Sequence, residues 1–301
     1  MAVIMDGKAI ANEIQNNLKN NISNYLEKNL RKPHLVVFLV GTEEASKVYV
    51  NHKIKVCEKL EIQVSLKTFN ENVSEQDLLT VINKVNNDDT VDVILVQLPL
   101  PKHLNKNRIL DHINARKDAD GLHYINAGKL FQGLKTIALC TPLGVIKLLE
   151  AYNIDVFKKT VTMVGTSNLV GKPLAIMLHH LGATVTLCNE NTVDLKRHTI
   201  GSDIVISAVG VANLIDETMV KANAIVVDVA IVRDLETNRI CGDIKFDTVK
   251  EKVSYITPVP GGIGPMTIAM LVTNVYDLYV INMNKKNLNV VNMNNKSLIV
   301  E

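Results

Sequence analysis

The sequence predicts an α/β fold with two domains, and three observations support this prediction. The chain has 301 residues, whereas a single hydrophobic core stops growing efficiently near roughly 250 residues. Strand patterns alternate with helical patterns before residue 100, which is typical of a parallel sheet covered by helices. A second alternating set begins after Thr141 and Pro142. We therefore expect two α/β domains in succession.

The first half of the chain carries the clearest periodic patterns. Apolar residues recur every four positions from Ile10 to Leu26, which predicts a long amphipathic helix. The apolar run His34–Val40 ends at a glycine and predicts a strand buried on both faces. Ser74 predicts the cap of a helix, because Asp77 follows three residues later. The other expected elements are a helix at 43–60, strands at 62–69 and 91–98, and a buried helix face made of Leu78, Leu79, Ile82 and Val85.

The second half repeats the alternation after a connecting helix at 143–152. Strands are expected at 160–164, 183–188, 203–209, 224–229 and 254–257, with helices between them. The last helix is expected at 265–281 and opens with Pro265, at a position where a missing N–H costs little. Beyond Asn282 the chain is rich in Asn and Lys, so we expect a mobile or loosely docked tail.

Composition excludes several classes of protein. Lys+Arg 33 against Asp+Glu 31 gives a net charge of +2, too small to hold nucleic acid or an anionic bilayer. The apolar stretch 91–100 is interrupted by Asp92, Gln97 and Pro99, and falls short of the ~20 residues of a membrane span. Early charged residues argue against a signal peptide. The four cysteines are scattered, so we expect no metal site and a reducing, cytoplasmic location.

The glycine turn between the strand at 160–164 and the next helix has features that are typical of a dinucleotide-binding site. Gly165 permits a tight turn and Gly171 lets the helix approach the strand, while free N–H groups face a pyrophosphate. The spacing is G-x-x-x-x-x-G rather than G-x-G-x-x-G, so an ordinary strand-to-helix turn stays open. Glu190 follows the next strand, where a carboxylate can accept from ribose hydroxyls.

Four further segments carry candidate site residues. Tyr49 and Lys53 are one helical turn apart and can serve proton transfer, or they can be a solvated lysine beside a tyrosine. Their Y-x-x-x-K spacing also occurs in short-chain dehydrogenases, but there it follows the nucleotide turn, whereas here it precedes it. The other segments are V-Q-L-P-L-P at 96–101, K-D-A-D-G-L-H at 117–123 and P-V-P-G-G-I-G-P-M-T at 258–267; a chain break, an acidic turn and a rigid linker are their simpler readings.

Taken in order with C-T-P-L-G at 140–144, these motifs resemble the bifunctional methylenetetrahydrofolate dehydrogenase/methenyltetrahydrofolate cyclohydrolase family. The resemblance extends from Asp6 to about Leu278. It implies an N-terminal three-layer α/β folate-side domain of residues 1–141 plus 266–285, and a Rossmann-type NAD(P)-binding domain of residues 142–265. It also implies an active site in a cleft between them and a homodimer that pairs through its Rossmann-type domains, where we expect the apolar segment 225–232 to be an exposed sheet edge. Residues 286–301 lie outside the resemblance, as a polar tail.

The resemblance assigns roles to individual residues. Lys53 matches the catalytic lysine, Tyr49 the tyrosine that packs on the folate rings, Gln97 the glutamine beside the lysine, and Asp120 the aspartate that holds the pterin. A lysine in water has a pKa of about 10.4, so a catalytic lysine has to be partly desolvated to act as a base. The residues expected to bind the substrate are Tyr49, Lys53, Gln97, Leu98, Asp120, Pro260, Gly261 and Gly262. The residues expected to bind the cofactor are Gly165, Thr166, Ser167, Gly171, Pro173, Glu190 and Ile231.

The sequence departs from the family pattern at the adenosine end of the cofactor site. Thr166 stands where many relatives carry Arg, and Asn189-Glu190 replaces a common His-Ser or His-Arg. Ala230 replaces a usual Gly. An acidic side chain near the 2′ position repels a phosphate, so we expect NAD to be preferred over NADP.

Three alternatives stay open at this point. The first is a dehydrogenase without cyclohydrolase activity, against which the retained Lys53 and Gln97 speak. The second is a non-catalytic folate- or nucleotide-binding relative. The third is an amino-acid or shikimate-type dehydrogenase, which shares the two-domain plan but does not explain K-D-A-D-G together with P-G-G-I-G-P.

Overall fold

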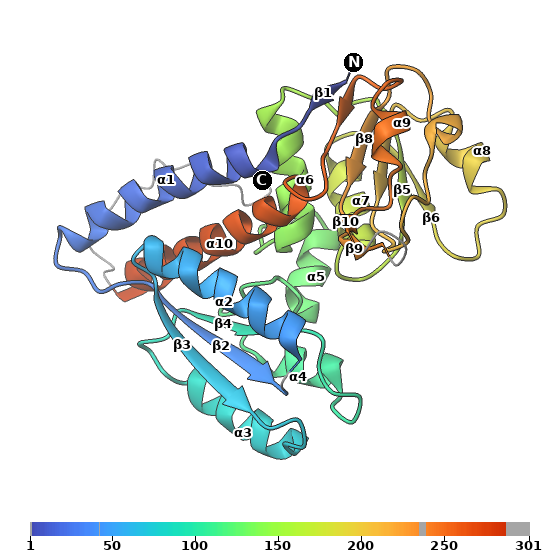
Figure 1. Ribbon diagram of the computed structural model, residues 1–301. Helices are drawn as coiled ribbons and strands as arrows, with labels where there is room; N and C mark the ends of the chain where they lie inside the picture. Colours follow the sequence, from blue (N-terminus) through green and yellow to red (C-terminus); the bar gives the residue numbers. More distant parts are fainter. Residues whose placement is uncertain (1, 42, 235–238, 287–301) are drawn as a thin grey trace. The chain divides into compact units, whose positions relative to one another are not determined.

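The computed structural model describes residues 2–41, 43–234 and 239–286 (Figure 1). The chain divides into two compact units. Residues up to 13 together with 139–270 form the large-sheet unit, and residues 14–138 together with the chain from 271 form the small-sheet unit. Both boundaries near the termini fall within helices, α1 (Gly7–Leu26) and α10 (Ile263–Lys286). The predicted two-domain α/β class is confirmed.

The small-sheet unit contains a three-stranded parallel sheet in the order β3-β2-β4. The central strand β2 (His34–Val40) has the predicted bounds and is buried along its whole length. Its neighbours are β3 (Gln63–Phe69) and β4 (Val93–Val96). The helices of this unit are α2 (Glu44–Lys59), α3 (Glu75–Asn86), α4 (Lys106–His112) and α5 (Tyr124–Phe131).

The cap predicted for α3 is present. The Ser74 hydroxyl accepts from the Asp77 backbone N–H at 3.1 Å, which satisfies one of the free donors at the helix start. Leu78, Leu79, Ile82 and Val85 are buried on α3 as predicted, and they pack in one core with Phe38 and Ile94 of the sheet. Burial of this apolar face is what fixes α3 on the sheet.

The large-sheet unit contains a six-stranded parallel sheet in the order β1-β11-β8-β7-β5-β6. These strands are β1 (Val3–Ile4), β5 (Thr160–Val164), β6 (Thr184–Cys188), β7 (Ile204–Ser207), β8 (Ile225–Asp228) and β11 (Tyr255–Ile256). Strands β9 (Val232–Arg233) and β10 (Ile240–Cys241) form a separate antiparallel pair. The helical segments are α6 (Cys140–Ala151), α7 (Gly171–His180), α8 (Leu195–Thr199), η1 (Glu217–Met219) and α9 (Phe246–Val249).

Two expectations about this sheet differ from the structure. Strand β1 pairs in parallel with β11, so the first residues belong to the large-sheet unit and not to the folate-side domain predicted over 1–141. A two-residue strand has no period that a sequence pattern can reveal. The segment 225–232, expected as an exposed sheet edge, contains β8, which lies between β11 and β7. The real edges of this sheet are β1 and β6.

Helix α10 is longer than predicted and ends at Lys286. By length and composition its segment Ile263–Asn284 can span a bilayer, but 67% of the most apolar window is buried inside the protein, as in the core helix of a soluble domain. The Asn282 side chain donates to Asp92 at 3.2 Å, so it belongs to the packed structure rather than to a tail. The predicted tail at 286–301 lies, from residue 287 onwards, outside the described residues.

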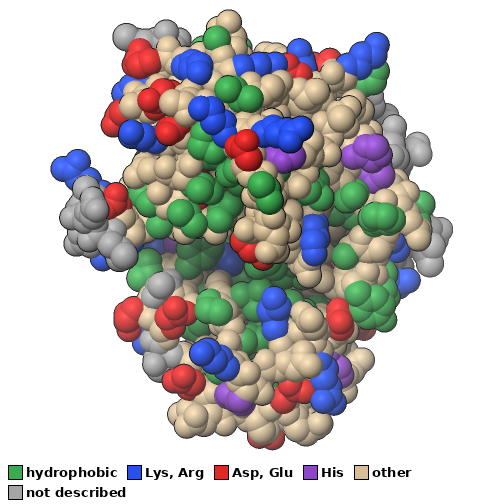
Figure 2. All heavy atoms as spheres, turned by 90° about the vertical axis from the view of Figure 1, so that its right-hand side faces the viewer, with side chains coloured by type: hydrophobic (Ala, Val, Ile, Leu, Met, Phe, Trp, Pro, Cys, Tyr) green, Lys and Arg blue, Asp and Glu red, His purple; other side chains and the backbone are tan. Residues whose placement is uncertain are grey.

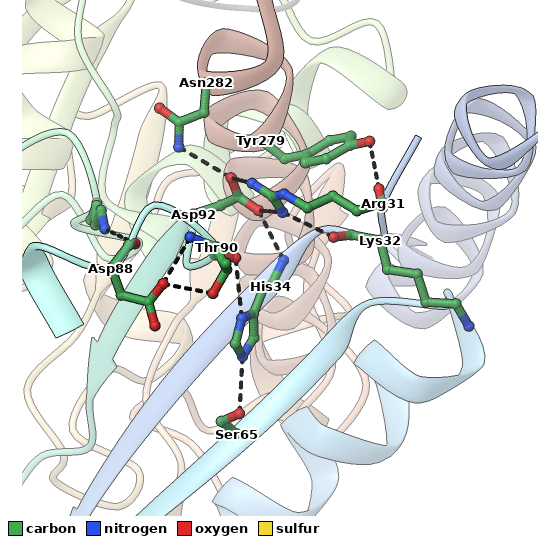
Figure 3. A network of polar contacts seen from close by, with 10 residues as sticks. Arg31, Lys32, His34, Ser65, Asp88, Thr90, Asp92, Tyr279 and Asn282 are labelled. Atoms are coloured by element: carbon green, nitrogen blue, oxygen red, sulfur yellow. Dashed lines mark hydrogen bonds and ion pairs between the residues drawn. The ribbon is translucent and has the colours of Figure 1, made fainter. Parts of the chain in front are cut away.

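A buried polar network ties α10 to the small sheet (Figure 3). The fully buried Asp92 carboxylate accepts two hydrogen bonds from the Arg31 guanidinium, at 2.6 and 2.7 Å, and one from the His34 backbone N–H at 3.0 Å. The Tyr279 hydroxyl donates to the Arg31 carbonyl at 2.7 Å. Bidentate pairing and backbone donors satisfy the buried charge, which is the condition under which such a pair is tolerated.

We predict that Asp92→Ala lowers the free energy of unfolding by about 3 kcal/mol, because it leaves the Arg31 guanidinium and the buried His34 N–H without their acceptor. Urea denaturation measures this loss. Lys32→Ala is the matched control, since it removes an exposed ion pair with Glu61 at 3.4 Å and is expected to cost less than about 1 kcal/mol. Equal losses in the two variants would contradict the role given to Asp92.

Candidate active site

Three predicted site residues come together at the carboxyl end of β4. Lys53 lies on α2, and its Nζ donates to the Gln97 side-chain oxygen at 3.0 Å. Both residues are buried, with 7% and 9% of their surface exposed. The same Nζ lies 5.1 Å from the centroid of the Tyr49 ring, one helical turn earlier. The lysine is therefore desolvated and oriented, as a catalytic base requires.

The orientation of Gln97 is fixed by its second contact. Its Nε2 donates to the Leu98 carbonyl at 2.6 Å, so the amide oxygen is the atom left to face Lys53. The partner of the lysine is thus a neutral amide, which holds the amine in place without forming an ion pair.

The loop that carries Asp120 is aligned with β4. The Ile94 N–H donates to the Lys117 carbonyl at 2.7 Å, and Ile94 and Asp118 form a parallel bridge. The half-buried Asp120 lies two residues after this bridge, in the direction in which β4 runs toward Gln97. The predicted pterin-binding carboxylate therefore belongs to the same edge of the sheet as the lysine and glutamine.

Asp118 is a residue of this loop that the sequence analysis did not single out. Its buried carboxylate accepts from the His123 N–H at 2.8 Å and from the Asn126 side chain at 3.0 Å. Burial raises the pKa of Asp118, and these two donors oppose the rise. Asp118 thus closes the K-D-A-D-G-L-H turn. The sequence signal that could have identified it is its position in this motif, two residues before Asp120.

Cys57 lies one helical turn after Lys53 and was not predicted to take part in the site. Burial raises the pKa of its thiol to about 12, although the positive charge of Lys53 lowers it somewhat. A neutral thiol is a poor nucleophile, so Cys57 packs beside the lysine rather than reacting.

The predicted substrate residues Pro260, Gly261 and Gly262 belong to the large-sheet unit, where their loop follows a narrowly defined path. A Cβ on Gly262 would lie 2.6 Å from the Pro258 carbonyl oxygen. The start of α1 packs on the same loop, since a Cβ on Gly7 would lie 2.0 Å from the Gly262 oxygen. Glycine is required at both positions because two stretches of backbone touch.

The predicted glycine turn joins β5 to α7 in the way that dinucleotide sites need. Gly165 has a φ of +100°, and a Cβ there would lie 2.4 Å from the Ala208 oxygen. A Cβ on Gly171 would lie 1.9 Å from the Gly165 oxygen. The turn also holds the exposed Ser167, whose hydroxyl accepts from the Val170 N–H at 3.2 Å, and the helix that follows buries Pro173.

Thr166 and Glu190 occupy equivalent positions just beyond the ends of the neighbouring strands β5 and β6. Val164 pairs with Cys188, and each of the two residues lies two positions beyond this pair. The Gly165 N–H donates to the Cys188 carbonyl at 2.8 Å and fixes the two strand ends together. Glu190 is exposed, as is Ile231 beyond the end of β8. Within the described part of the chain, no three His, Cys, Asp or Glu side chains are grouped to hold a metal ion.

Comparison with known proteins matches nearly the whole chain. Residues 5–120 match the model of the tetrahydrofolate dehydrogenase/cyclohydrolase catalytic domain, and residues 139–283 match that of the NAD(P)-binding domain. The bifunctional protein FolD of Mycoplasma mycoides subsp. mycoides is 52% identical over 94% of this chain and 98% of its own length.

Two solved structures are also similar over the full fold. The bifunctional enzyme FolD, a methylenetetrahydrofolate dehydrogenase/cyclohydrolase, from Campylobacter jejuni is 46% identical with a TM-score of 0.91, covering 95% of this chain and 100% of that one. The FolD of Trypanosoma brucei, in complex with NADP and an inhibitor, is 31% identical with a TM-score of 0.88, covering 96% and 99%.

We predict that Gly171→Ala weakens binding of a nicotinamide dinucleotide at least about tenfold, because the added methyl overlaps the Gly165 oxygen and has to displace the turn. Titration of the purified variant with the dinucleotide measures this. Gly128→Ala is the matched control, since nothing lies within 4 Å of its added Cβ on α5. It is expected to leave binding unchanged and to stabilise the helix by roughly 0.5 to 1 kcal/mol. Equal binding by both variants would contradict the role of Gly171.

Proposed function

The chain belongs to the tetrahydrofolate dehydrogenase/cyclohydrolase family, and from this premise we infer how its residues divide the two reactions. The protein oxidises 5,10-methylenetetrahydrofolate to the methenyl form with NAD(P), and hydrolyses that product to 10-formyltetrahydrofolate, in one-carbon metabolism. The hydrogen bond between Lys53 and Gln97 carries the assignment of the hydrolytic step to the small-sheet unit.

The oxidation depends on geometry more than on acid or base. The nicotinamide ring, when bound, accepts the hydride that leaves the one-carbon bridge. The residues of the large-sheet unit have to hold the dinucleotide so that the two carbons meet, and the Gly165–Gly171 turn is its pyrophosphate site. Tyr49 packs on the folate rings. Asp120 accepts two N–H donors from the amino-pyrimidine edge of the pterin, a charge-assisted pairing that fixes the orientation of the rings.

The hydrolysis needs a proton acceptor. Water adds to the methenyl carbon and loses a proton to Lys53. The bond from that carbon to the ring nitrogen then breaks as Lys53 returns the proton to the nitrogen, and the hydroxyl group releases its own proton to solvent as the formyl C=O forms. Gln97 orients the amine toward the substrate. The retained Lys53–Gln97 pair favours this bifunctional assignment over a dehydrogenase without hydrolytic activity.

We predict that Lys53→Ala lowers the rate of methenyltetrahydrofolate hydrolysis by at least about a hundredfold, because the base is removed. The fold persists, although loss of a buried donor to Gln97 costs about 1 to 3 kcal/mol, more than the small effect expected for an exposed side chain. Absorbance of the methenyl compound measures the rate. Lys55→Ala, at an exposed position of the same helix, is the control. Hydrolysis at the wild-type rate in Lys53→Ala would make the assignment wrong.

We also propose that NAD is preferred over NADP. The exposed Glu190 lies beyond β6 at the position that meets the ribose 2′ group, where a phosphate would face a like charge. Thr166 carries no compensating positive charge. The Lys196 Nζ donates to the Thr218 hydroxyl at 3.2 Å. The exposed Arg197, also on α8, can oppose this preference by attracting a 2′-phosphate.

The expected result is a higher kcat/KM with NAD than with NADP, and a gain of about tenfold in NADP use in Glu190→Ser, since about 1.4 kcal/mol of repulsion corresponds to that factor. Steady-state kinetics with each cofactor measure both. Glu251→Ser, at another exposed carboxylate of the large-sheet unit, is expected to change neither value. Equal use of both cofactors by the wild type, or better use of NADP, would count against the proposal.

For assembly and location we propose a cytoplasmic homodimer. The segment 225–232 does not supply the edge expected for pairing, because β8 is internal to the sheet. The edge strand β6 supports the proposal instead, since it exposes unpaired backbone and Leu187 is 47% exposed. The four cysteines all lie in the described residues and form no disulfide with one another, which is compatible with a reducing compartment. On the face drawn in Figure 2, Lys and Arg are interspersed with Asp and Glu, which does not favour a nucleic-acid partner. Sedimentation as a monomer at micromolar concentration would contradict the dimer.

A further inference from the structure

A buried carboxylate lies beneath the loop that follows β7. Asp243 is 0% exposed and accepts four hydrogen bonds, one from the last residue of β7 and three from this loop. The donors are the Ser207 hydroxyl at 2.6 Å and the backbone N–H groups of Val209, Gly210 and Val211, at 2.7, 2.9 and 2.8 Å. Two carboxylate oxygens offer about four acceptor sites, so the loop uses the whole capacity of Asp243.

This arrangement decides which side of the loop faces outward. Three successive N–H groups point to the buried side, where Asp243 accepts them. The side chains of Val209 and Val211 are 45% and 48% exposed. Gly210 between them has a φ of +89°, which lets the chain turn its N–H inward there. The loop thus presents apolar side chains rather than hydrogen-bond donors.

The loop lies directly beside the glycine turn. Val164 at the end of β5 pairs with Ser207 at the end of β7, and the Ala208 oxygen is the atom that a Cβ on Gly165 would touch. Ligands of open parallel sheets bind outside the carboxyl ends of the strands. Because β6 with Glu190 flanks β5 on one side and β7 flanks it on the other, the adenosine half belongs to the β6 side and the nicotinamide half to the β7 side.

A second buried carboxylate holds Asp243 in position. Asp228, at the end of β8, accepts from the backbone N–H groups of Asp243 at 3.1 Å and Ile244 at 2.8 Å. Gly242 lies so close that a Cβ there would be 2.0 Å from an Asp228 oxygen. Burial raises the pKa of Asp228 to about 6, and the neighbouring Asp243 charge adds to the rise while the backbone donors oppose it. The two aspartates connect the end of β8 to the loop after β7.

We propose that Asp243 is a positioning residue for the nicotinamide half of the cofactor. By holding the three N–H groups on the buried side, its carboxylate keeps Val209 and Val211 as an apolar wall against which the nicotinamide ring packs. This inference rests on the proposed dehydrogenase function, and it concerns a residue that touches neither reacting carbon.

The test is Asp243→Asn. The amide keeps the shape of the side chain but replaces one acceptor oxygen by a donor, so about half of the four contacts are lost. We expect the KM for NAD to rise at least about tenfold. Hydrolysis of added methenyltetrahydrofolate needs no dinucleotide, so its rate is expected to stay within about twofold of the wild type. Ser207→Ala removes one donor only, and we expect a rise of about threefold.

Asp203→Asn is the matched control. Asp203 precedes β7 at the opposite, amino end, and its carboxylate accepts from the Thr160 N–H at 2.8 Å and from Lys221 at 2.6 Å. This variant is expected to lose stability with no change in the KM for NAD.

An unchanged KM in Asp243→Asn with hydrolysis intact, or an equal rise in Asp203→Asn, would overturn the inference. If Asp243→Asn also loses hydrolysis and does not fold, Ser207→Ala decides: a raised KM supports the inference and an unchanged KM overturns it. A wild-type protein that hydrolyses methenyltetrahydrofolate but oxidises nothing with either dinucleotide would overturn the proposed dehydrogenase function itself.

Discussion

A backbone N–H group in a loop has to find an acceptor, and in three loops of this protein a buried aspartate carboxylate supplies it. Asp118 accepts from the turn before α5, Asp228 from the segment after β10, and Asp243 from the loop after β7. Each of these segments lies beside candidate site residues. Because a buried charge is stable only when its acceptor sites are filled, each aspartate admits few conformations of its loop. The loop that carries Asp120 and the loop after β7 are held in place in this way.

Glycines serve the same architecture by letting the backbone approach another backbone segment or a buried carboxylate closely. Gly171 lies against the Gly165 carbonyl, Gly7 against that of Gly262, and Gly242 against the Asp228 carboxylate. In each case an added Cβ would overlap another atom, whatever the backbone angles. The G-x-x-x-x-x-G spacing places glycine at both positions of the turn where an added Cβ would overlap a backbone oxygen.

Most of the longer elements could be predicted from the sequence, whereas three of the two-residue strands could not. Strands β2 and β5 have the predicted bounds, and Ser74 caps α3, because period and capping are local signals. Strand β1 and the pair β9–β10 have two residues each, too few for a period. Among polar groups, the resemblance supplied Lys53 and Gln97. It did not supply Asp243, whose contacts cross more than 30 residues of sequence and leave no local pattern.

The two reactions make different physical demands, and the chain places the groups that meet them on different sheets. Hydrolysis needs a desolvated amine with a neutral partner, which Lys53 and Gln97 provide within the small-sheet unit. Hydride transfer needs a rigid surface that holds a ring in place, which the loop above Asp243 provides within the large-sheet unit. The hydrogen bond between Lys53 and Gln97 lies within one unit, and those that Asp243 accepts lie within the other, so a substitution in one set can alter its reaction alone. That independence allows one chain to carry two successive steps on the same substrate.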